Sequence, residues 1–399
     1  MNPIDNPFAP GAGTPPPKLA GRDSVRDQMT LCIKRLQKGR PAKSIMLVGL
    51  RGVGKTVLLD QMMKDAIADG VIAIRIEAPE NRSLPAILAP QLRLGLLKLS
   101  KVEAAKDIAV RGLRALAGFA GKLKATYGDI EVGIDYESEP GLADNGDLEG
   151  DLTMLLEQLG AAAAAASVLV VIYIDELQYV KELQMAALIS ALHRCSQLKL
   201  PLTVVGAGLP QLRGRMGEAK SYAERLFDFP YIGPLLPHDA RDAIEKPIND
   251  EGAQIEPDAA DLIVEHTRGY PYFLQEWGKH AWDTARKSPI TVADVEAAST
   301  QTVAALDESF FRVRFDRLTP TEKLYLRAMA QLGPGPHRSG DIAAVLKRAS
   351  TSFAPIRSNL IAKGMIWSPT HGDTAFTVPL FDEFMKRIIS NEDWMKADG

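Results

Sequence analysis

Cysteine is scarce in this chain of 399 residues: only Cys32 and Cys195 are present, and they are too far apart for a C-x-x-C pair. This scarcity excludes a disulfide framework and a cysteine-rich zinc site. It is typical of proteins from a reducing compartment, so we expect a cytoplasmic location.

Long apolar runs and targeting signals are also lacking. The longest uncharged apolar run extends from Gly160 to Ile174, which is too short for a spanning helix, and it stops at Asp175. The first residues, MNPIDNPFAPGAG, have neither the basic nor the apolar segment of a signal peptide. We therefore expect no membrane span and no membrane partner.

A general excess of positive charge is missing as well. The net charge is −3 and the composition, 46% apolar and 24% charged, is that of an ordinary globular protein. These values exclude a globally basic nucleic-acid binder but leave room for a local basic patch. A chain of this length is too long to fold around one typical hydrophobic core, so we predict two or three domains.

What the chain does have is a glycine-rich turn after a short apolar strand, in IMLVGLRGVGKT at residues 45–56, which fits G-x-x-x-x-G-K-[ST]. Such glycines let successive backbone N–H groups point at a phosphate, and the helix that follows adds its positive N-terminal end. In this motif the lysine reaches the β- and γ-phosphates and the threonine hydroxyl ligates Mg²⁺. We predict that ATP or ADP binds here with Mg²⁺, and the candidate residues are Gly49, Arg51, Gly52, Val53, Gly54, Lys55, Thr56 and Val57. The alternative is a glycine turn that binds nothing.

Two acidic residues follow a second buried strand, in VLVVIYIDELQ at 168–178. Asp175, at the end of the strand, is placed to reach Mg²⁺ directly or through water, and Glu176 to orient and polarise an attacking water. The competing interpretation is a simple helix cap. Together with the loop at 49–56, the pair predicts a catalytic site for ATP hydrolysis with Lys55 and Glu176 as its central residues.

The alternation of strands and helices up to about residue 207 predicts an α/β fold with a parallel, doubly wound sheet. We predict a flexible, poorly packed arm at 1–18, a P-loop nucleotide-binding domain at 19–236, an α-helical lid at 237–307 and a winged helix-turn-helix domain at 308–399. Residues 129–151 hold nine carboxylates and no Lys or Arg. Their spacing matches no EF-hand loop, so we expect a solvated, mobile acidic insertion there.

On these motifs the chain resembles the AAA+ ATPases, in particular the branch of origin-recognition-complex-type initiators and the related STAND signalling ATPases. Within LAGRD, Gly21 and Arg22 are similar to the hhGR[ED] motif that borders the nucleotide base. Arg225 lies where an arginine finger is often found, and Pro271 of GYP resembles the lid proline that approaches the nucleotide in STAND proteins. The resemblance runs from about residue 19 to 388.

The resemblance implies ATP binding with Mg²⁺, and a finger at Arg225 would act in trans, so it also implies self-association in the ATP state. A surface ion pair is the alternative for this arginine. The fourth core strand ends at Gly206 and Ala207 without the usual polar sensor, for which Thr203 and Gln178 are poor substitutes. The lid also lacks the G-D-x-R arginine. These gaps imply a slow ATPase that works as a nucleotide-dependent switch.

A local basic patch is present near the C-terminus, where Arg312 to Trp367 contain ten Lys or Arg and only three Asp or Glu. Phosphates are the natural partner of such a patch, and Arg357 on the expected recognition helix is placed to face a major groove. We therefore predict a nucleotide-controlled protein that binds DNA. The alternative is a STAND-type signalling or anti-phage defence ATPase whose winged helix contacts a protein partner.

Overall fold

The computed structural model describes the whole chain except residues 12, 79, 81, 128–135, 371 and 391–399. It divides into two compact units. The first, here called the sheet unit, comprises Arg22–Val48 and Lys55–Tyr231. The second, the helical unit, comprises Met1–Gly21, Gly49–Gly54 and Ile232–Gly399.

A five-stranded parallel sheet with the order β2-β3-β4-β1-β5 forms the centre of the sheet unit. Its strands are β1 (Ser44–Val48), β2 (Ile72–Glu77), β3 (Val170–Asp175), β4 (Leu202–Gly208) and β5 (Phe227–Asp228). Every residue of β3 and β4 is buried, as expected for strands covered on both faces. The predicted doubly wound parallel sheet is confirmed. Its parallel strands bring the ends of β1 and β3 to the same edge.

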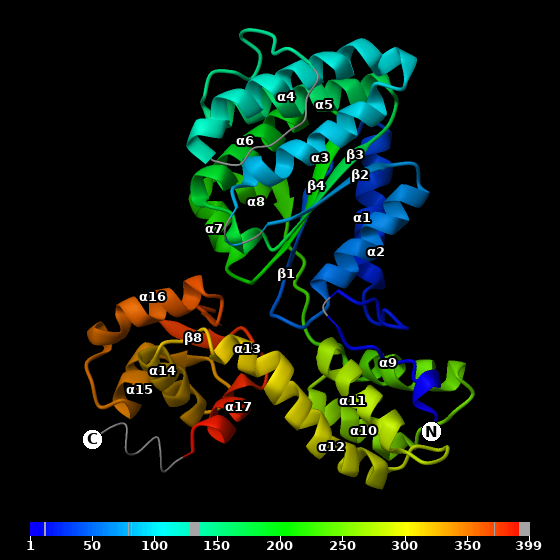
Figure 1. Cartoon of the computed structure of the whole chain (residues 1–399), viewed down its shortest axis with the longest axis vertical. Helices are drawn as coiled ribbons and strands as arrows, with labels where there is room; N and C mark the ends of the chain where they lie inside the picture. The colour runs from blue at the N-terminus through cyan, green and yellow to red at the C-terminus, as the bar shows by residue number, and fades with distance from the viewer. Residues whose placement is uncertain (12, 79, 81, 128–135, 371, 391–399) are drawn as a thin grey trace. The chain divides into compact units, whose positions relative to one another are not determined.

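Helices cover both faces of this sheet; in Figure 1, α1 and α2 lie on one side and α3 to α6 on the other. The helices of the sheet unit are α1 (Asp23–Gln37), α2 (Lys55–Ala68), α3 (Leu84–Leu99), α4 (Lys106–Tyr127), α5 (Leu148–Ala165), α6 (Glu182–Gln197), α7 (Leu212–Ala219) and α8 (Ala223–Leu226). The alanine-rich end of α5 is packed, because Ala162 and Ala163 are fully buried. A Cβ on Gly160 would lie only 2.9 Å from Leu200. The small side chains therefore allow close helix packing.

The described part of the acidic segment differs from the expected mobile insertion. Asp151 is fully buried and accepts the N–H groups of Asn145 (3.0 Å) and Gly146 (2.8 Å). Glu139 and Glu149 form ion pairs with Arg111 and Lys220. Asp144 accepts the Gly141 N–H, and Asp147 accepts the Gly150 N–H at the start of α5. Carboxylates that accept backbone N–H groups fix a loop, so residues 136–151 form a structured connection; the first acids lie outside the described residues. The part of the chain that the structure describes contains no cluster of three or more His, Cys, Asp or Glu side chains that could hold a metal ion.

Four helices and a short π-helical turn open the C-terminal part of the helical unit. They are α9 (Pro237–Asp250), α10 (Pro257–Thr267), α11 (Pro271–Thr284), α12 (Val292–Leu306) and the turn Asp307–Phe311. The turn delivers Phe310 and Phe311 to an aromatic cluster, in which the rings of Phe311 and Phe384 stack at 5.2 Å.

The remaining residues form helices around a small antiparallel sheet of order β6-β8-β7. These elements are α13 (Arg312–Phe315), α14 (Pro320–Gln331), β6 (His337–Arg338), α15 (Ser339–Val345), α16 (Ala354–Ala362), β7 (Ile366–Trp367), β8 (Asp373–Phe376) and α17 (Phe381–Ile388). A helical C-terminal region is thus present. Among the described residues, no helix combines the length and apolar character needed to cross a membrane.

The N-terminal residues differ from the poorly packed arm that their proline and glycine content indicated. Phe8 is buried, and its ring lies against Gly278 of α11, where a Cβ would come within 2.8 Å. The indole N–H of Trp282 donates to the Asn2 carbonyl at 2.9 Å, and the Asn6 amide donates to Asp283 at 2.8 Å. One aromatic anchor and several polar contacts therefore hold this segment on α11.

Candidate nucleotide site

Residues Gly49–Gly54 connect β1 to α2, and three glycines in this loop have a backbone reason to be glycine. Gly52 and Gly54 adopt φ values of 78° and 84°, which disfavour any side chain. At Gly49 a Cβ would lie 2.1 Å from the Ile232 carbonyl oxygen. Val53 is fully buried and anchors the loop. This is the narrow, side-chain-poor turn that the motif predicted.

The loop also contacts two other parts of the helical unit. The Gly52 carbonyl accepts the N–H of Tyr272 at 3.2 Å, and the Arg51 N–H donates to the Thr377 carbonyl at 3.1 Å. Tyr272 follows Pro271, the first residue of α11, so the residues of the expected lid proline lie beside the loop. Arg51 therefore contributes its backbone to packing against the residue that follows β8.

Lys55 and Thr56 are the first two residues of α2. Both are half-buried, as is Val57, and the N-terminal backbone N–H groups of a helix have no partner within it. A helix N-terminus with a lysine and a hydroxyl in its first turn favours an anionic ligand. These residues follow the carboxyl end of β1, at the same sheet edge as Asp175.

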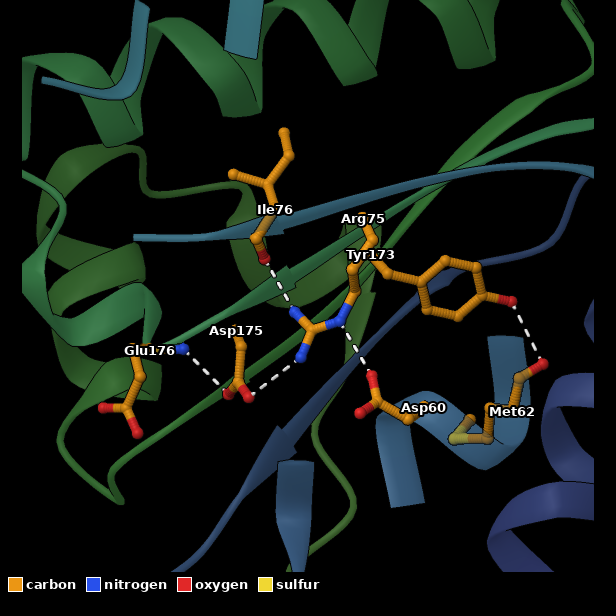
Figure 2. A network of polar contacts seen from close by, with 7 residues as sticks. All are labelled: Asp60, Met62, Arg75, Ile76, Tyr173, Asp175 and Glu176. Atoms are coloured by element: carbon orange, nitrogen blue, oxygen red, sulfur yellow. Dashed lines mark hydrogen bonds and ion pairs between the residues drawn. The ribbon is translucent and has the colours of Figure 1, made fainter. Parts of the chain in front are cut away.

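Asp175 ends β3 and is almost fully buried, with 4% of its side chain exposed. One carboxylate oxygen accepts the Glu176 N–H at 2.8 Å, and the other lies 3.3 Å from Nη2 of Arg75 (Figure 2). The guanidinium of Arg75 also donates from Nε to Asp60 at 2.8 Å and from Nη1 to the Ile76 carbonyl at 2.7 Å. A buried carboxylate is thus kept paired, as burial of charge requires.

Sequence reasoning missed Arg75 and Asp60. No motif marks them, and they meet Asp175 only because β2 pairs with β3 and α2 packs against the sheet. The one available signal was an arginine that interrupts the apolar residues of the strand IAIRIE. A charged residue in such a strand needs a partner.

Glu176 adopts a left-handed backbone conformation, with φ 56° and ψ 35°. Non-glycine residues in this region are uncommon and concentrate at functional sites. The Gln178 amide donates to the Glu176 carboxylate, while its oxygen accepts the Leu209 N–H at 3.1 Å. Gln178 therefore links Glu176 to the residue that follows β4, a role that the sequence did not indicate.

Tyr173 connects this strand to α2, since its hydroxyl donates to the Met62 carbonyl at 3.3 Å. Burial is the main reason that the pKa of Tyr173 is raised well above its ordinary value, with Cys32 and Asp65 adding to the effect. The phenol therefore stays protonated and remains a donor. It helps to hold α2, which carries Lys55 and Thr56, against β3.

Comparison with known protein families covers this region and the C-terminal one separately. Residues 18–205 match the AAA ATPase domain family. Residues 308–385 match a domain of unknown function (DUF8462). None of the curated proteins matches the chain.

Solved structures resemble the chain in fold. A Walker-type ATPase of Pyrococcus abyssi is 15% identical, with a TM-score of 0.57 over 92% of this chain and 96% of that one. The Aeropyrum pernix ORC1 protein in complex with DNA is 16% identical, with a TM-score of 0.48 over 96% of this chain and 95% of that one. The K64R mutant of Thermotoga maritima RuvB is 15% identical, with a TM-score of 0.45 over 89% and 92%. At these identities, the first likeness shows a shared fold, and the P-loop AAA+ fold is confirmed.

Within the sheet unit, Arg225 lies apart from Asp175. Arg225 is exposed beside the amino end of β1, where it lines a cavity of about 200 Å³ with Ser44 and Thr203. In the sheet unit this is the opposite end of the strand from the one that leads to Lys55. Within one chain, Arg225 therefore does not join the carboxylates at the end of β3.

The residues of the LAGRD motif have clear structural roles. Gly21, with φ 63°, passes close to Asp239, whose carboxylate oxygen would lie 2.6 Å from a Cβ there. Arg22 is buried and precedes α1 of the sheet unit. In the helical unit, Arg268 forms an ion pair with Glu383 of α17 at 2.6 Å.

Several basic side chains of the C-terminal patch serve the fold rather than an external ligand. Arg357 donates to the Thr374 hydroxyl at 2.9 Å and to the Asp373 carbonyl at 2.9 Å, which corrects the expectation that it faces a groove. Arg327 is fully buried and donates to the Ile389 carbonyl, and Lys363 forms an ion pair with Glu322 at 2.7 Å. The exposed basic residues of the patch are Arg312, Arg317, Arg338, Lys347, Arg348 and the ion-paired Lys363.

Proposed function

We propose that the chain is an AAA+ molecular switch that binds ATP or ADP with Mg²⁺ and hydrolyses ATP slowly. One observation carries this proposal: Lys55 and Thr56 begin α2 at the sheet edge where β3 delivers a buried Asp175 followed by Glu176. A loop with positive φ at Gly52 and Gly54 leads into that helix. This combination supports phosphate binding beside a carboxylate pair.

The residues present fit Mg²⁺. The Thr56 hydroxyl and the Asp175 carboxylate are hard oxygen ligands, which this ion prefers, and no Cys or His side chain is needed. When bound, Mg²⁺ would neutralise phosphate charge and polarise the phosphoryl oxygens. Lys55 would add a second positive charge on the β- and γ-phosphates.

Glu176 would orient the attacking water and accept its proton. Its carboxylate already accepts the Gln178 amide, so the amide competes with water for the same group. The end of β4 is apolar at Ala207 and offers no polar sensor side chain. Both features support slow turnover, as a switch requires, over rapid cycling.

Arg225 is proposed to act on the site of a neighbouring subunit, because it does not join the carboxylates of its own AAA domain. Arg225→Ala is then expected to lower ATP turnover by about 10³-fold or more while ATP affinity stays nearly unchanged. Mixing this variant with a Glu176→Gln chain and measuring phosphate release is the test. Partial recovery of activity in the mixture is expected. A chain that stays monomeric with ATP at every concentration contradicts the role in trans.

We further propose that the C-terminal region is a winged helix that binds duplex DNA. Its helices surround a three-stranded sheet in the order expected of such a domain, and five basic side chains are exposed in addition to the ion-paired Lys363. Because Arg357 is held by Thr374 and Asp373, binding would rest on phosphate contacts more than on base reading. The nucleotide state would control assembly and DNA binding.

The salt dependence of DNA binding tests this second proposal. If about five basic side chains contact phosphates, log K should fall with log[salt] at a slope of about −4.5 for the full chain and a random duplex. Arg338→Ala combined with Arg348→Ala is expected to weaken all sequences alike and to reduce the slope by about 2. Lys246→Ala, which removes an exposed lysine of α9, is the control and should change neither.

A STAND-type signalling ATPase is the second candidate function. The observation that favours it is that Arg357, Arg327 and Lys363 direct their donors to groups within the domain, which leaves fewer donors for DNA phosphates. Failure of the full chain to bind duplex DNA at low salt would contradict the DNA proposal. The C-terminal region would then be a protein-interaction module.

A further inference from the structure

Arg75 connects the two elements that carry the candidate Mg²⁺ ligands. It lies on β2 and its guanidinium reaches Asp60, four residues after Thr56 on α2, and Asp175 at the end of β3 (Figure 2). Nothing in the nucleotide-binding motifs requires an arginine here. We therefore ask what Arg75 contributes to the site in addition to the phosphate loop and the Asp175–Glu176 pair.

The three contacts of the guanidinium differ in length. Nε lies 2.8 Å from Asp60 and Nη1 lies 2.7 Å from the Ile76 carbonyl, whereas Nη2 lies 3.3 Å from Asp175. The Asp175 contact is the longest and lies beyond the usual range of a charge-assisted hydrogen bond. It can be given up while the other two hold the side chain in place.

The positive and negative charges in this group are also unequal in number. One guanidinium faces two carboxylates, and a quarter of the Arg75 side chain is exposed compared with 4% of the Asp175 side chain. Arg75 supplies a positive charge 3.3 Å from the buried Asp175 carboxylate. A second cation that approaches the same oxygen is repelled by Arg75 and attracted by the carboxylate.

We propose that Arg75 is a positioning residue that acts as a resident cation for Asp175 and sets the Mg²⁺ concentration that nucleotide binding requires. This inference rests on the proposed nucleotide site. Nη2 neutralises Asp175 in this structure; with nucleotide and Mg²⁺ bound, Nη2 would withdraw and Asp60 would retain the guanidinium. The arginine thereby disfavours a divalent cation on Asp175 when no phosphate is present to share it.

Two substitutions are expected to shift the Mg²⁺ requirement in opposite directions. Arg75→Gln removes the competing charge, so the Mg²⁺ concentration for half-maximal ADP binding should fall about tenfold. Asp60→Asn removes the carboxylate that retains the guanidinium, so Arg75 should pair more closely with Asp175 and the requirement should rise severalfold. A bridge that only held α2 to β3 would predict the same direction for both variants.

The experiment uses the full chain, a fluorescent N-methylanthraniloyl derivative of ADP at fixed concentration, and Mg²⁺ titrated from zero, with binding followed by anisotropy. Arg75→Lys keeps the charge and should retain a requirement close to that of the wild type, which separates charge from packing if Arg75→Gln folds poorly. Arg194→Gln removes an exposed ion pair with Glu157 (2.9 Å) on the same unit and is the matched control.

Opposite shifts for the two variants support the proposal. Shifts in one direction, or none, overturn it while leaving the nucleotide site intact. If the wild-type chain binds no ADP at any Mg²⁺ concentration, the proposed function itself is contradicted and the inference falls with it.

Discussion

Lys55→Ala is expected to weaken ADP binding by about 100-fold or more, which corresponds to about 2.7 kcal/mol. The reason is the loss of the positive charge at the start of α2 that we propose pairs with the β-phosphate. Hydrogen bonds to charged groups contribute about 1.5–3 kcal/mol each, so the loss of one or two of them accounts for the effect. Isothermal titration of the full chain with ADP and Mg²⁺ measures it.

Lys64→Ala is the matched control for this variant. Lys64 lies on the same helix, nine residues further on, and is exposed. Its removal should leave ADP affinity unchanged. Equal affinities of the wild type and Lys55→Ala would contradict the assignment of residues 49–56 as the phosphate loop.

Glu176→Gln is expected to keep ADP and ATP affinity and to lower turnover by about 10²- to 10⁴-fold. An amide accepts no proton from water, whereas its oxygen can still accept the Gln178 N–H group, so local structure should be retained. Phosphate release under single-turnover conditions, at saturating ATP, separates the chemical step from binding.

Glu182→Gln provides the control for the catalytic role. Glu182 is an exposed acid in the first turn of α6, six residues along the chain, and its substitution should leave turnover unchanged. Hydrolysis at the wild-type rate in Glu176→Gln would mean that Glu176 serves only the backbone turn after β3. The proton acceptor would then be another group.

Local sequence was enough to predict the parts of the site that lie within one element or one turn. The glycines at 49, 52 and 54 meet backbone requirements that a short motif encodes, namely a close approach to Ile232 and two positive φ values. Asp175 and Glu176 follow a strand whose apolar run already marked it as buried. The parallel sheet followed from the alternation of such strands with helices.

Tertiary contacts could not be predicted in the same way. Arg75 meets Asp175 across a strand pair and Asp60 across a helix–sheet contact, so no spacing in the sequence reveals the group. Arg357 donates to Thr374 of β8, so a residue that was expected to bind DNA forms a hydrogen bond within the domain. Phe8 is far in sequence from Gly278, so composition alone indicated a loose arm.

The central claim is that residues 49–56 hold the phosphates of a nucleotide, and amide hydrogen exchange of the full chain with and without ADP and Mg²⁺ tests it most directly. The account predicts strong protection of the backbone amides in peptides that span 49–57, because those N–H groups would donate to phosphate oxygens. It predicts no such protection at the exposed end of α2 around Lys64. Saturating MgADP that leaves exchange at 49–57 unchanged would contradict the claim.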